Sequence, residues 1–281
     1  MIKKTAVFCI PVKNESSNLK NLFKTLENIT KSFKDHYIIF VESDSTDNSS
    51  ILIKEFLINK KGILLNKSIK NIKNRVARLA ISRNEYLKYI KKNNKLINFD
   101  FLIVLDCGGV NNSLNSNKLQ KSIFQNKKWI GIFPNQNIFY YDIWTLRIKN
   151  VINYDCYEQL FKNFLNKEKN ISKIFFRLVG KFMFINFLVK SNKIKVISAY
   201  GGMAIYKLGK VIEFSYDSNK GKNCEHVEFN KKIIKKYGEC LIIDKNLTNS
   251  LGINIHTINI LLCSISNFFA KRFIKKILCN F

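Results

Sequence analysis

The chain has 281 residues, of which 46% are hydrophobic and 13% aromatic, so it can bury a large core and is too apolar to be disordered. Lys and Arg number 48 against 20 Asp and Glu, and the formal net charge of +28 favours anionic partners such as nucleotide phosphates, nucleic acid or acidic lipid headgroups. No stretch reaches the roughly 20 uninterrupted apolar residues that cross a bilayer, which excludes an obvious membrane span.

Short apolar runs alternate with helical patterns over the first 130 residues. Strands are predicted at 5–12, 37–43, 62–66 and 100–106, and helices at 16–33, 48–58 and 74–93. Two further apolar stretches follow at 129–135 and 140–147. Strand and helix in alternation predict one α/β domain with a mainly parallel central sheet flanked by helices.

The second half of the chain is less regular. Helices are expected within 153–193, strand character returns at 195–208 around a Gly-Gly pair, and 240–247 reads as a last strand. From about residue 254 the composition changes to a basic amphipathic helix. We therefore predict a main domain over 1–245 and a helical tail over 246–281, which either docks on the core or lies on an anionic membrane surface.

Acidic and hydroxyl side chains follow two of the predicted strands. The string "ESDSTDNSS", which contains Glu42 and Asp44, comes directly after the apolar run 37–41, and Asp106 ends "LIVLD". The carboxyl ends of parallel strands meet at one edge of a sheet, where ligands bind in open α/β folds. These loops are therefore expected to face one crevice, although the same residues also suit a turn and a helix cap.

Three arginines lie on the helix predicted between these loops. Arg75 and Arg78 are three residues apart and share a helix face, whereas Arg83 is offset from them. Guanidinium groups bind phosphate oxygens, and a nearby carboxylate can hold a divalent ion, which together suit a nucleoside diphosphate. A solvated helix face is the simpler alternative.

Four motifs in this order resemble the GT-A nucleotide-sugar glycosyltransferases, broadly family 2: "IPVKNESSNL", "VESDSTDNSSILI", "ARLAISRNEYL" and "LIVLD". The later "YYDIWTLR", "YGGMAIYK" and "CEHVEFN" look more like the branch related to fungal capsule mannosyltransferases. The resemblance extends over about 1–245. It implies a GT-A fold and a nucleotide-sugar donor.

The resemblance also implies donor-site residues. Glu42 takes the position that contacts the base or ribose, with Asp44 in the same loop, and Arg83 takes a position near the donor diphosphate. The remaining donor-site residues that we expect are Pro11, Asn14, Glu15, Arg75, Arg78 and Asp106.

The chain departs from the family at the metal-binding D-x-D motif, which here reads Asp106-Cys107-Gly108. One carboxylate holds Mn2+ or Mg2+ poorly, so either another group completes the site or Lys and Arg neutralise the leaving phosphate. His226 is the best substitute ligand beside Asp106, because a late His next to a carboxylate binds metal in several GT-A enzymes. A core or capping histidine is the alternative.

Glycosyl transfer with inversion requires a base that takes the acceptor proton. Glu225 is our first candidate by analogy with the late acidic motif of family 2, and Asp142 is the second; a retaining enzyme would need neither. Aromatic side chains beside a carboxylate suit a sugar, so Tyr141 and Trp144 are assigned to the sugar or acceptor. Gly201 and Gly202 join them where backbone could approach a ligand, unless they form a turn.

The sequence therefore predicts a glycosyltransferase that moves a sugar from a nucleoside-diphosphate-sugar to a glycan or lipid-linked glycan. Two alternatives remain open: a degenerate GT-A domain that binds nucleotide sugar without turnover, and a basic nucleic-acid-binding protein. The latter lacks any recognised nucleic-acid motif, so no nucleic acid is expected as a partner. Seven scattered cysteines without a C-x-x-C pair indicate a reducing, cytoplasmic setting, with the tail placing the enzyme at the inner face of a membrane if it binds lipid.

Overall fold

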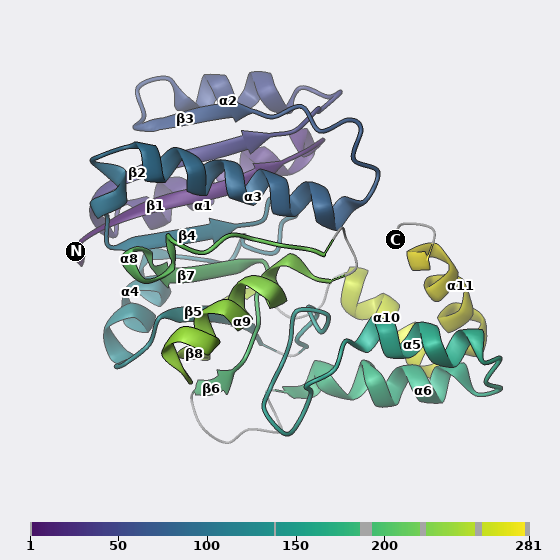
Figure 1. The fold of residues 1–281 in the computed structure, drawn as a ribbon. Helices are drawn as coiled ribbons and strands as arrows, with labels where there is room; N and C mark the ends of the chain where they lie inside the picture. Colours follow the sequence, from purple (N-terminus) through teal and green to yellow (C-terminus); the bar gives the residue numbers. More distant parts are fainter. Residues whose placement is uncertain (1, 138, 186–192, 220–222, 251–254, 279–281) are drawn as a thin grey trace.

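The computed structural model describes residues 2–137, 139–185, 193–219, 223–250 and 255–278, which form an α/β fold around an eight-stranded sheet (Figure 1). The strands are β1 (Ile2–Val12), β2 (Phe33–Glu42), β3 (Gly62–Asn66), β4 (Phe101–Leu105), β5 (Gly131–Gln136), β6 (Lys193–Val196), β7 (Met203–Lys207) and β8 (Leu241–Ser250). The helices are α1 (Ser16–Thr30), α2 (Ser49–Leu57), α3 (Arg75–Lys92), α4 (Ser116–Gln125), α5 (Cys156–Leu165), α6 (Ile171–Leu178), α8 (Leu208–Val211), α9 (Glu225–Tyr237), α10 (Ile255–Ile265) and α11 (Asn267–Leu278), with 3-10 turns η1 (Leu96–Asn98) and η2 (Gly180–Phe184).

The sheet is mainly parallel, as the alternating pattern predicts. Its order is β3-β2-β1-β4-β7-β5-β8-β6. Strands β3, β2, β1, β4, β5 and β8 run in one direction, whereas β7 and β6 run in the other. The carboxyl ends of β1, β2 and β4 therefore meet at one edge, next to the start of the reversed β7.

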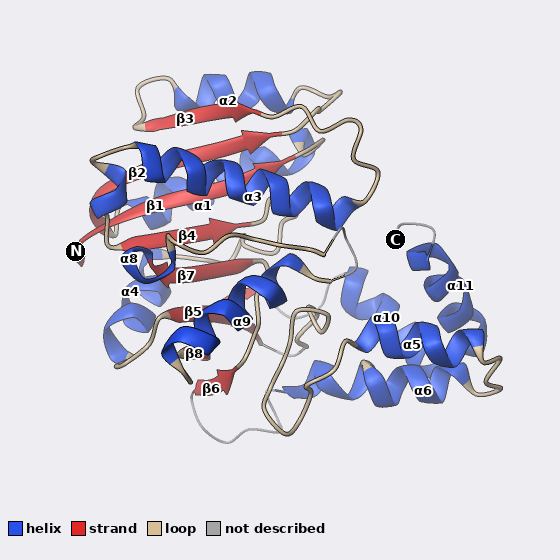
Figure 2. Ribbon diagram, in the orientation of Figure 1, coloured by secondary structure: helices blue, strands red, loops and turns tan. Residues whose placement is uncertain are grey.

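Both faces of the sheet are buried, which explains why its strands read as nearly continuous apolar runs. Along β1, Ala6, Phe8 and Ile10 pack with residues of α1 and α4, while Val7 and Cys9 point to the opposite face. Helices α3 and α9 cover that second face (Figure 2). The six cysteines that the structure describes are buried and unpaired, as expected for small core residues.

Helices α5, α6, α10 and α11 form a helical lobe beyond the carboxyl ends of the strands (Figure 1). Its interior includes Phe175 of α6, Ile260 and Cys263 of α10, and Ile274 of α11. The C-terminal segment thus docks on the core through one of its faces. No described helix combines the length and the hydrophobicity needed to cross a bilayer.

The C-terminal region differs from the prediction in two details. Instead of one helix there are two, α10 and α11, separated at Ser266. Strand β8 runs from Leu241 to Ser250, so it crosses the boundary predicted between 245 and 246. Residues 140–147, an apolar stretch in the sequence, form irregular turns that connect the sheet to the helical lobe.

Asp155 fixes the conformation of these turns. One carboxylate oxygen accepts hydrogen bonds from the backbone N–H groups of Tyr157 and Glu158, which caps α5. The other accepts from Arg147 Nη2 at 3.0 Å and Trp144 Nε1 at 2.9 Å. Because the Arg147 side chain is only 5% exposed, Asp155 supplies the counter-charge for a buried cation.

Replacing Asp155 with Ala is expected to lower the free energy of unfolding by about 3 kcal/mol, since it leaves the Arg147 charge unpaired and removes a helix cap. Urea denaturation followed by circular dichroism measures the change. Glu158→Ala is the matched control, because Glu158 pairs with Lys162 on the exposed face of α5 and should contribute less than about 1 kcal/mol. Equal losses in the two variants would contradict the role of Asp155.

Candidate active site

A cavity of about 1080 Å³ is lined by residues at the carboxyl edge of the sheet and by residues of the helical lobe. It is lined by the ends of β1 and β4, the first half of α3, the turns at 141–145, the start of α9, and residues of α10 and α11. The structure brings most of the sequence-predicted site residues into this one cavity: Pro11, Asn14, Glu15, Arg75, Arg78, Arg83, Asp106, Tyr141, Asp142, Trp144, Glu225 and His226.

Glu42 and Asp44 do not line the cavity, contrary to the expectation that this acidic loop faces the crevice. The Glu42 carboxylate is buried and accepts a hydrogen bond from the Ser45 backbone N–H. Asp44, in a left-handed backbone conformation at φ 56°, accepts from the Ile69 N–H at 2.7 Å, a bond that lowers its pKa. Both acids therefore hold loops in place.

The rest of the acidic loop supports the cavity wall formed by residues 13–15. Asn14 accepts a hydrogen bond from the Thr46 N–H at 2.7 Å, and its own N–H donates to Ser45 Oγ at 3.0 Å. Asp47 accepts from the Ser16 N–H at 3.0 Å at the start of α1. The turn-and-cap interpretation of "ESDSTDNSS" is thus the one that the geometry supports, and the loop acts on the cavity through Asn14.

Gly201 and Gly202 lie outside the cavity lining, and their predicted contact with a sugar stays a prediction. They form a turn before β7 with φ values of 64° and 84°, a region that glycine adopts without strain. A Cβ atom on Gly202 would collide with Val110 Cγ1. The pair is needed for a tight turn packed beneath the cavity.

Arg83 lies at the floor of the cavity and is only 1% exposed. Its Nη2 donates to Asp106 Oδ1 at 3.2 Å, and its Nε donates to Glu225 Oε1 at 3.3 Å. Tyr200 adds a hydroxyl hydrogen bond to the same Asp106 oxygen at 2.9 Å and places its ring 5.1 Å from the guanidinium carbon. Arg83 therefore neutralises and orients two carboxylates through Nε and Nη2, while its buried Nη1 has no hydrogen-bond partner among the described residues.

His226 is buried beside this ion pair. Its ring stacks on Tyr200 with centroids 3.6 Å apart, and among the described residues neither ring nitrogen has a hydrogen-bond partner. Burial, with the Arg83 charge as a second cause, lowers the pKa of His226 well below its usual value. Burial and the nearby Arg83 charge thus disfavour the protonated imidazole.

The donor set does not fit a divalent metal held by the protein alone. Asp106 Oδ1 is already shared by Arg83 and Tyr200, and the Arg83 cation lies directly behind it. Within the described part of the chain, no three His, Cys, Asp or Glu side chains are grouped to bind a metal, so Asp106 and His226 are not completed by a third ligand. Cys107 does not substitute, because burial raises the pKa of its thiol well above normal.

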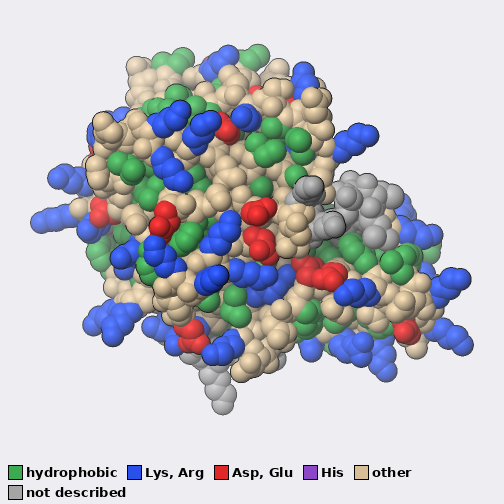
Figure 3. All heavy atoms as spheres, in the orientation of Figure 1, with side chains coloured by type: hydrophobic (Ala, Val, Ile, Leu, Met, Phe, Trp, Pro, Cys, Tyr) green, Lys and Arg blue, Asp and Glu red, His purple; other side chains and the backbone are tan. Residues whose placement is uncertain are grey.

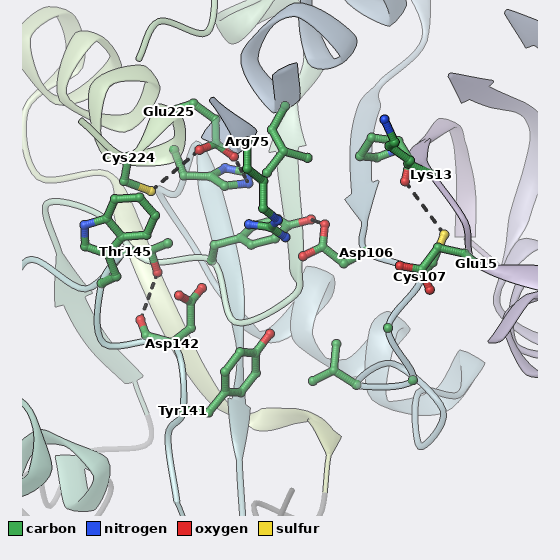
Figure 4. A pocket seen from close by; sticks show the side chains of 18 of the residues that line it. Lys13, Glu15, Arg75, Asp106, Cys107, Tyr141, Asp142, Thr145, Cys224 and Glu225 are labelled. Carbon is green, nitrogen blue, oxygen red and sulfur yellow. Dashed lines mark hydrogen bonds and ion pairs between the residues drawn. The ribbon is translucent and has the colours of Figure 1, made fainter. Parts of the chain in front are cut away.

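Cationic side chains line another part of the cavity. Lys13 follows β1, and Arg75 and Arg78 project from the first turn of α3. Arg78 is oriented by two hydrogen bonds from Nη1 to the Ile72 and Lys73 carbonyl oxygens, both 3.0 Å. Figure 4 shows Asp106 between the Lys13 side of the cavity and the Asp142 side. Ammonium and guanidinium groups of this kind can bind the phosphate oxygens of an anionic ligand.

Asp142 is an acidic residue of the cavity whose pKa is raised. Its Oδ2 accepts a hydrogen bond from the Gly201 N–H at 2.9 Å, and no basic side chain forms an ion pair with it among the described residues. Burial, followed by repulsion from Asp106 and Glu225, raises the pKa of Asp142 to about 6. Glu225 is 3% exposed and forms an ion pair with Arg83.

A buried amide network beneath Gly201 was missed by the sequence reasoning. Asn249 Nδ2 donates to the Gly201 carbonyl at 2.7 Å and to Asn111 Oδ1 at 2.9 Å. Gln136 Nε2 donates to Asn249 Oδ1 at 3.1 Å, while its Oε1 accepts from the Tyr141 N–H at 3.2 Å. The network thus holds the backbone of Tyr141, which precedes Asp142, and that of Gly201, whose N–H donates to Asp142. Gln136 is a polar residue at the end of an apolar strand, as Asp106 is directly after one. This position could have identified Gln136 as a candidate from the sequence.

Comparisons with known proteins address the family and the fold of the chain. No curated protein sequence matches the chain. A mannosyltransferase from Pyrobaculum calidifontis, solved with GDP-Man and Mn2+, has a TM-score of 0.53 at 11% identity, over 99% of this chain and 65% of that one. This chain thus spans slightly less than two-thirds of that structure. Glucosyl-3-phosphoglycerate synthase from Mycobacterium tuberculosis has a TM-score of 0.46 at 9% identity, over 93% and 80% of the two chains.

At 11% identity, the similarity to the Pyrobaculum structure shows the GT-A fold alone. The sequence itself matches the model of glycosyl transferase family 2 over residues 7–187, well over half of the chain and including Asn14, Arg83, Asp106 and Asp142. The chain therefore belongs to glycosyl transferase family 2 and has the GT-A fold.

Proposed function

We propose that the enzyme transfers a sugar from a nucleoside-diphosphate-sugar donor to a hydroxyl of a glycan or lipid-linked glycan. One observation carries this proposal: a single cavity combines a cationic wall of Lys13, Arg75 and Arg78 with a carboxyl group, Asp142, whose pKa is near neutrality. The cationic wall suits the diphosphate, and the carboxyl group suits the acceptor hydroxyl. A nucleic-acid-binding role has no comparable support from the cavity.

The donor would lie along the cavity edge formed by residues 11–15 and the first turn of α3. Pro11, Asn14 and Glu15 line this edge, and Arg75 and Arg78 face it from the helix. Glu42 and Asp44 act indirectly, by supporting the loops that carry these residues. Arg83 orients Asp106, so its contribution to donor binding passes through that carboxylate.

We assign the acceptor base to Asp142, in preference to Glu225. In an inverting transfer, the acceptor oxygen forms a bond to the anomeric carbon and its proton passes to an Asp142 oxygen. The bond from the anomeric carbon to the leaving diphosphate breaks, and its electron pair goes to the phosphate. A base with a pKa near the working pH accepts a proton efficiently, whereas Glu225 is committed to Arg83. In a retaining transfer Asp142 would position the acceptor beside Tyr141 and Trp144.

Purified protein incubated with UDP-, GDP- and CMP-sugars is expected to release the nucleotide from one donor class, and Asp106→Ala is expected to lose about a hundredfold in rate. Nucleotide release measured by chromatography gives the rate, and calorimetry gives donor binding. Asp217→Ala, on the exposed surface, is the matched control. Donor binding without release, even with acceptors supplied, would identify a degenerate binding domain, and absence of both would refute the proposal.

Transfer is expected to fall tenfold per pH unit below about pH 6, because protonated Asp142 cannot accept the acceptor proton. Asp142→Asn should remove this acid limb and reduce the transfer rate by about a hundredfold or more. The pH profile of the rate at saturating donor tests both statements, with Asp217→Asn as the control of equal charge change. An unchanged acid limb in Asp142→Asn would assign the base elsewhere, with Glu225 the next candidate.

We also propose that Lys13, Arg75 and Arg78 replace the charge that a protein-bound metal supplies in relatives with a complete D-x-D motif. Gly108 occupies the position of the second Asp of the D-x-D motif, so the site lacks that carboxylate. A Cβ atom at Gly108 would meet no other atom within 4 Å. The space for the missing side chain is therefore present.

Nucleotide binding by the natural protein is expected to persist in EDTA, whereas Gly108→Asp should gain Mn2+ affinity by about tenfold or more. Loss of the free-Mn2+ electron paramagnetic resonance signal measures the ion directly. Gly209→Asp is the matched control, because Gly209 also has open space around its Cβ position but lies on α8, outside the cavity lining. Tight Mn2+ binding by the natural protein would overturn the charge-replacement proposal.

A cytoplasmic enzyme acting at the inner face of a membrane is consistent with buried, unpaired cysteines and a basic C-terminal segment. At that location, a lipid-linked glycan in the membrane would be the source of the acceptor hydroxyl.

A further inference from the structure

Helix α10 exposes an unpartnered apolar stripe. Ile255, Ile258, Leu262 and Ile265 follow one another at spacings of three or four residues, which places them along one face of the helix. Ile255, Ile258 and Ile265 are exposed, and Leu262 is half-buried. The opposite face, with Ile260 and Cys263, packs into the core. The helix contains no Lys, Arg, Asp or Glu, so nothing charged interrupts the stripe.

The exposed apolar residues are concentrated at this place. The described residues include eleven exposed large hydrophobic side chains, and five of them lie within 255–269. Ile265 is 78% exposed and Phe268 is 66% exposed, and both flank the turn between α10 and α11 together with Phe269. Single exposed apolar residues are ordinary on a protein surface, but a continuous group indicates a binding surface.

One end of the stripe reaches the active-site cavity. Ile255, which is 64% exposed, also lines the cavity, as do Ile260 and Phe273 of the same two helices. Trp144 and Tyr157 extend this apolar wall toward Asp142. A molecule with an apolar tail could therefore keep the tail on α10 while its polar end lies at the carboxyl group.

Basic side chains border the exposed corner. Lys271, Arg272 and Lys275 project from the solvent-facing side of α11, next to Phe268 and Phe269. Figure 3 shows Lys and Arg side chains around the outside of the helical lobe. An apolar surface bordered by cations is complementary to a bilayer with anionic headgroups, where apolar groups enter the acyl boundary and cations meet phosphates.

We infer that the α10 stripe and the α10–α11 turn bind the surface of an anionic lipid bilayer, so that the cavity opens toward the membrane and receives a lipid-borne acceptor. The membrane contact stands on the surface itself, whereas the lipid-borne acceptor rests on the proposed function. Charge complementarity selects a bilayer over a second copy of this chain, because two copies would bring the same three cations together.

Flotation of the full chain with vesicles tests the contact. Binding to phosphatidylcholine vesicles that contain phosphatidylglycerol is expected, with much weaker binding to phosphatidylcholine alone. The triple variant Ile258→Ser/Ile265→Ser/Phe268→Ser should lose binding by about tenfold or more. Ile51→Ser/Ile58→Ser/Phe124→Ser is the matched control, since it removes equally exposed side chains from α2, its C-terminal end and α4 and should bind as the natural protein does.

The charge contribution has its own pair of variants. Lys271→Gln/Arg272→Gln/Lys275→Gln should weaken binding to the anionic vesicles by about a hundredfold. Lys20→Gln/Lys24→Gln/Lys54→Gln removes the same charge from exposed positions on α1 and α2 and should have only a few-fold effect. Thermal unfolding of all four variants checks that the surface changes leave the fold intact.

Several outcomes would overturn the inference: no binding to anionic vesicles, equal binding to neutral vesicles, or equal effects in a variant and its control. Sedimentation velocity tests one further contrary outcome. If the natural protein is a dimer and the Ile258→Ser/Ile265→Ser/Phe268→Ser variant is a monomer, the stripe binds a second copy of the chain. Donor binding measured without vesicles separates the two proposals. Vesicle binding without donor binding would support the membrane contact and refute the glycosyl-transfer proposal. Donor binding without vesicle binding would support the glycosyl-transfer proposal and refute the membrane contact.

Discussion

The buried guanidinium of Arg83 organises the floor of the cavity. Taking such a charge out of water is costly and is compensated only by close partners, which here are the carboxylates of Asp106 and Glu225 and the faces of Tyr200 and Tyr216. These partners come from the end of β4, the start of α9 and the loops before β7 and α9. One ion-pair cluster therefore fixes the relative positions of α3, α9 and the sheet edge, and a change in any member disturbs all of them.

The N-terminal half of the fold was predictable because its signals are local. Each strand from β1 to β4 is an apolar run, each helix has a periodic apolar face, and parallel order follows from their alternation. The reversed strands β6 and β7 were not predictable in this way. Their neighbours are set by pairings such as Val104 with Ala204 and Ile194 with Ile243, which join segments distant in sequence. The division of the tail into α10 and α11 likewise depends on packing against α6.

The candidate site was predicted unevenly for a related physical reason. Residue type and position identified Asp106, Asp142 and the α3 arginines, but not what each side chain contacts. Arg83 was expected at a phosphate, and the structure shows that it also pairs with two carboxylates. Glu42 was expected at a ligand, and its carboxylate accepts a hydrogen bond within its own loop. Asn249 and Gln136 had no distinguishing sequence context beyond their position at strand ends, because their role depends on a hydrogen-bond network assembled from three distant segments.

The position of β8 inside the sheet affects how the protein folds. Its pairing of Leu241 with Gly131 closes a long loop, and β6 can join the sheet only through β8. Long-range strand pairings form slowly, and without β8 one edge of β5 is unpaired; unpaired edges of this kind promote aggregation. Asn249 arrives with β8 and completes the support beneath Gly201. A folding intermediate with an ordered β1–β4 half would therefore have the donor edge of the cavity well before the backbone around Asp142 is fixed.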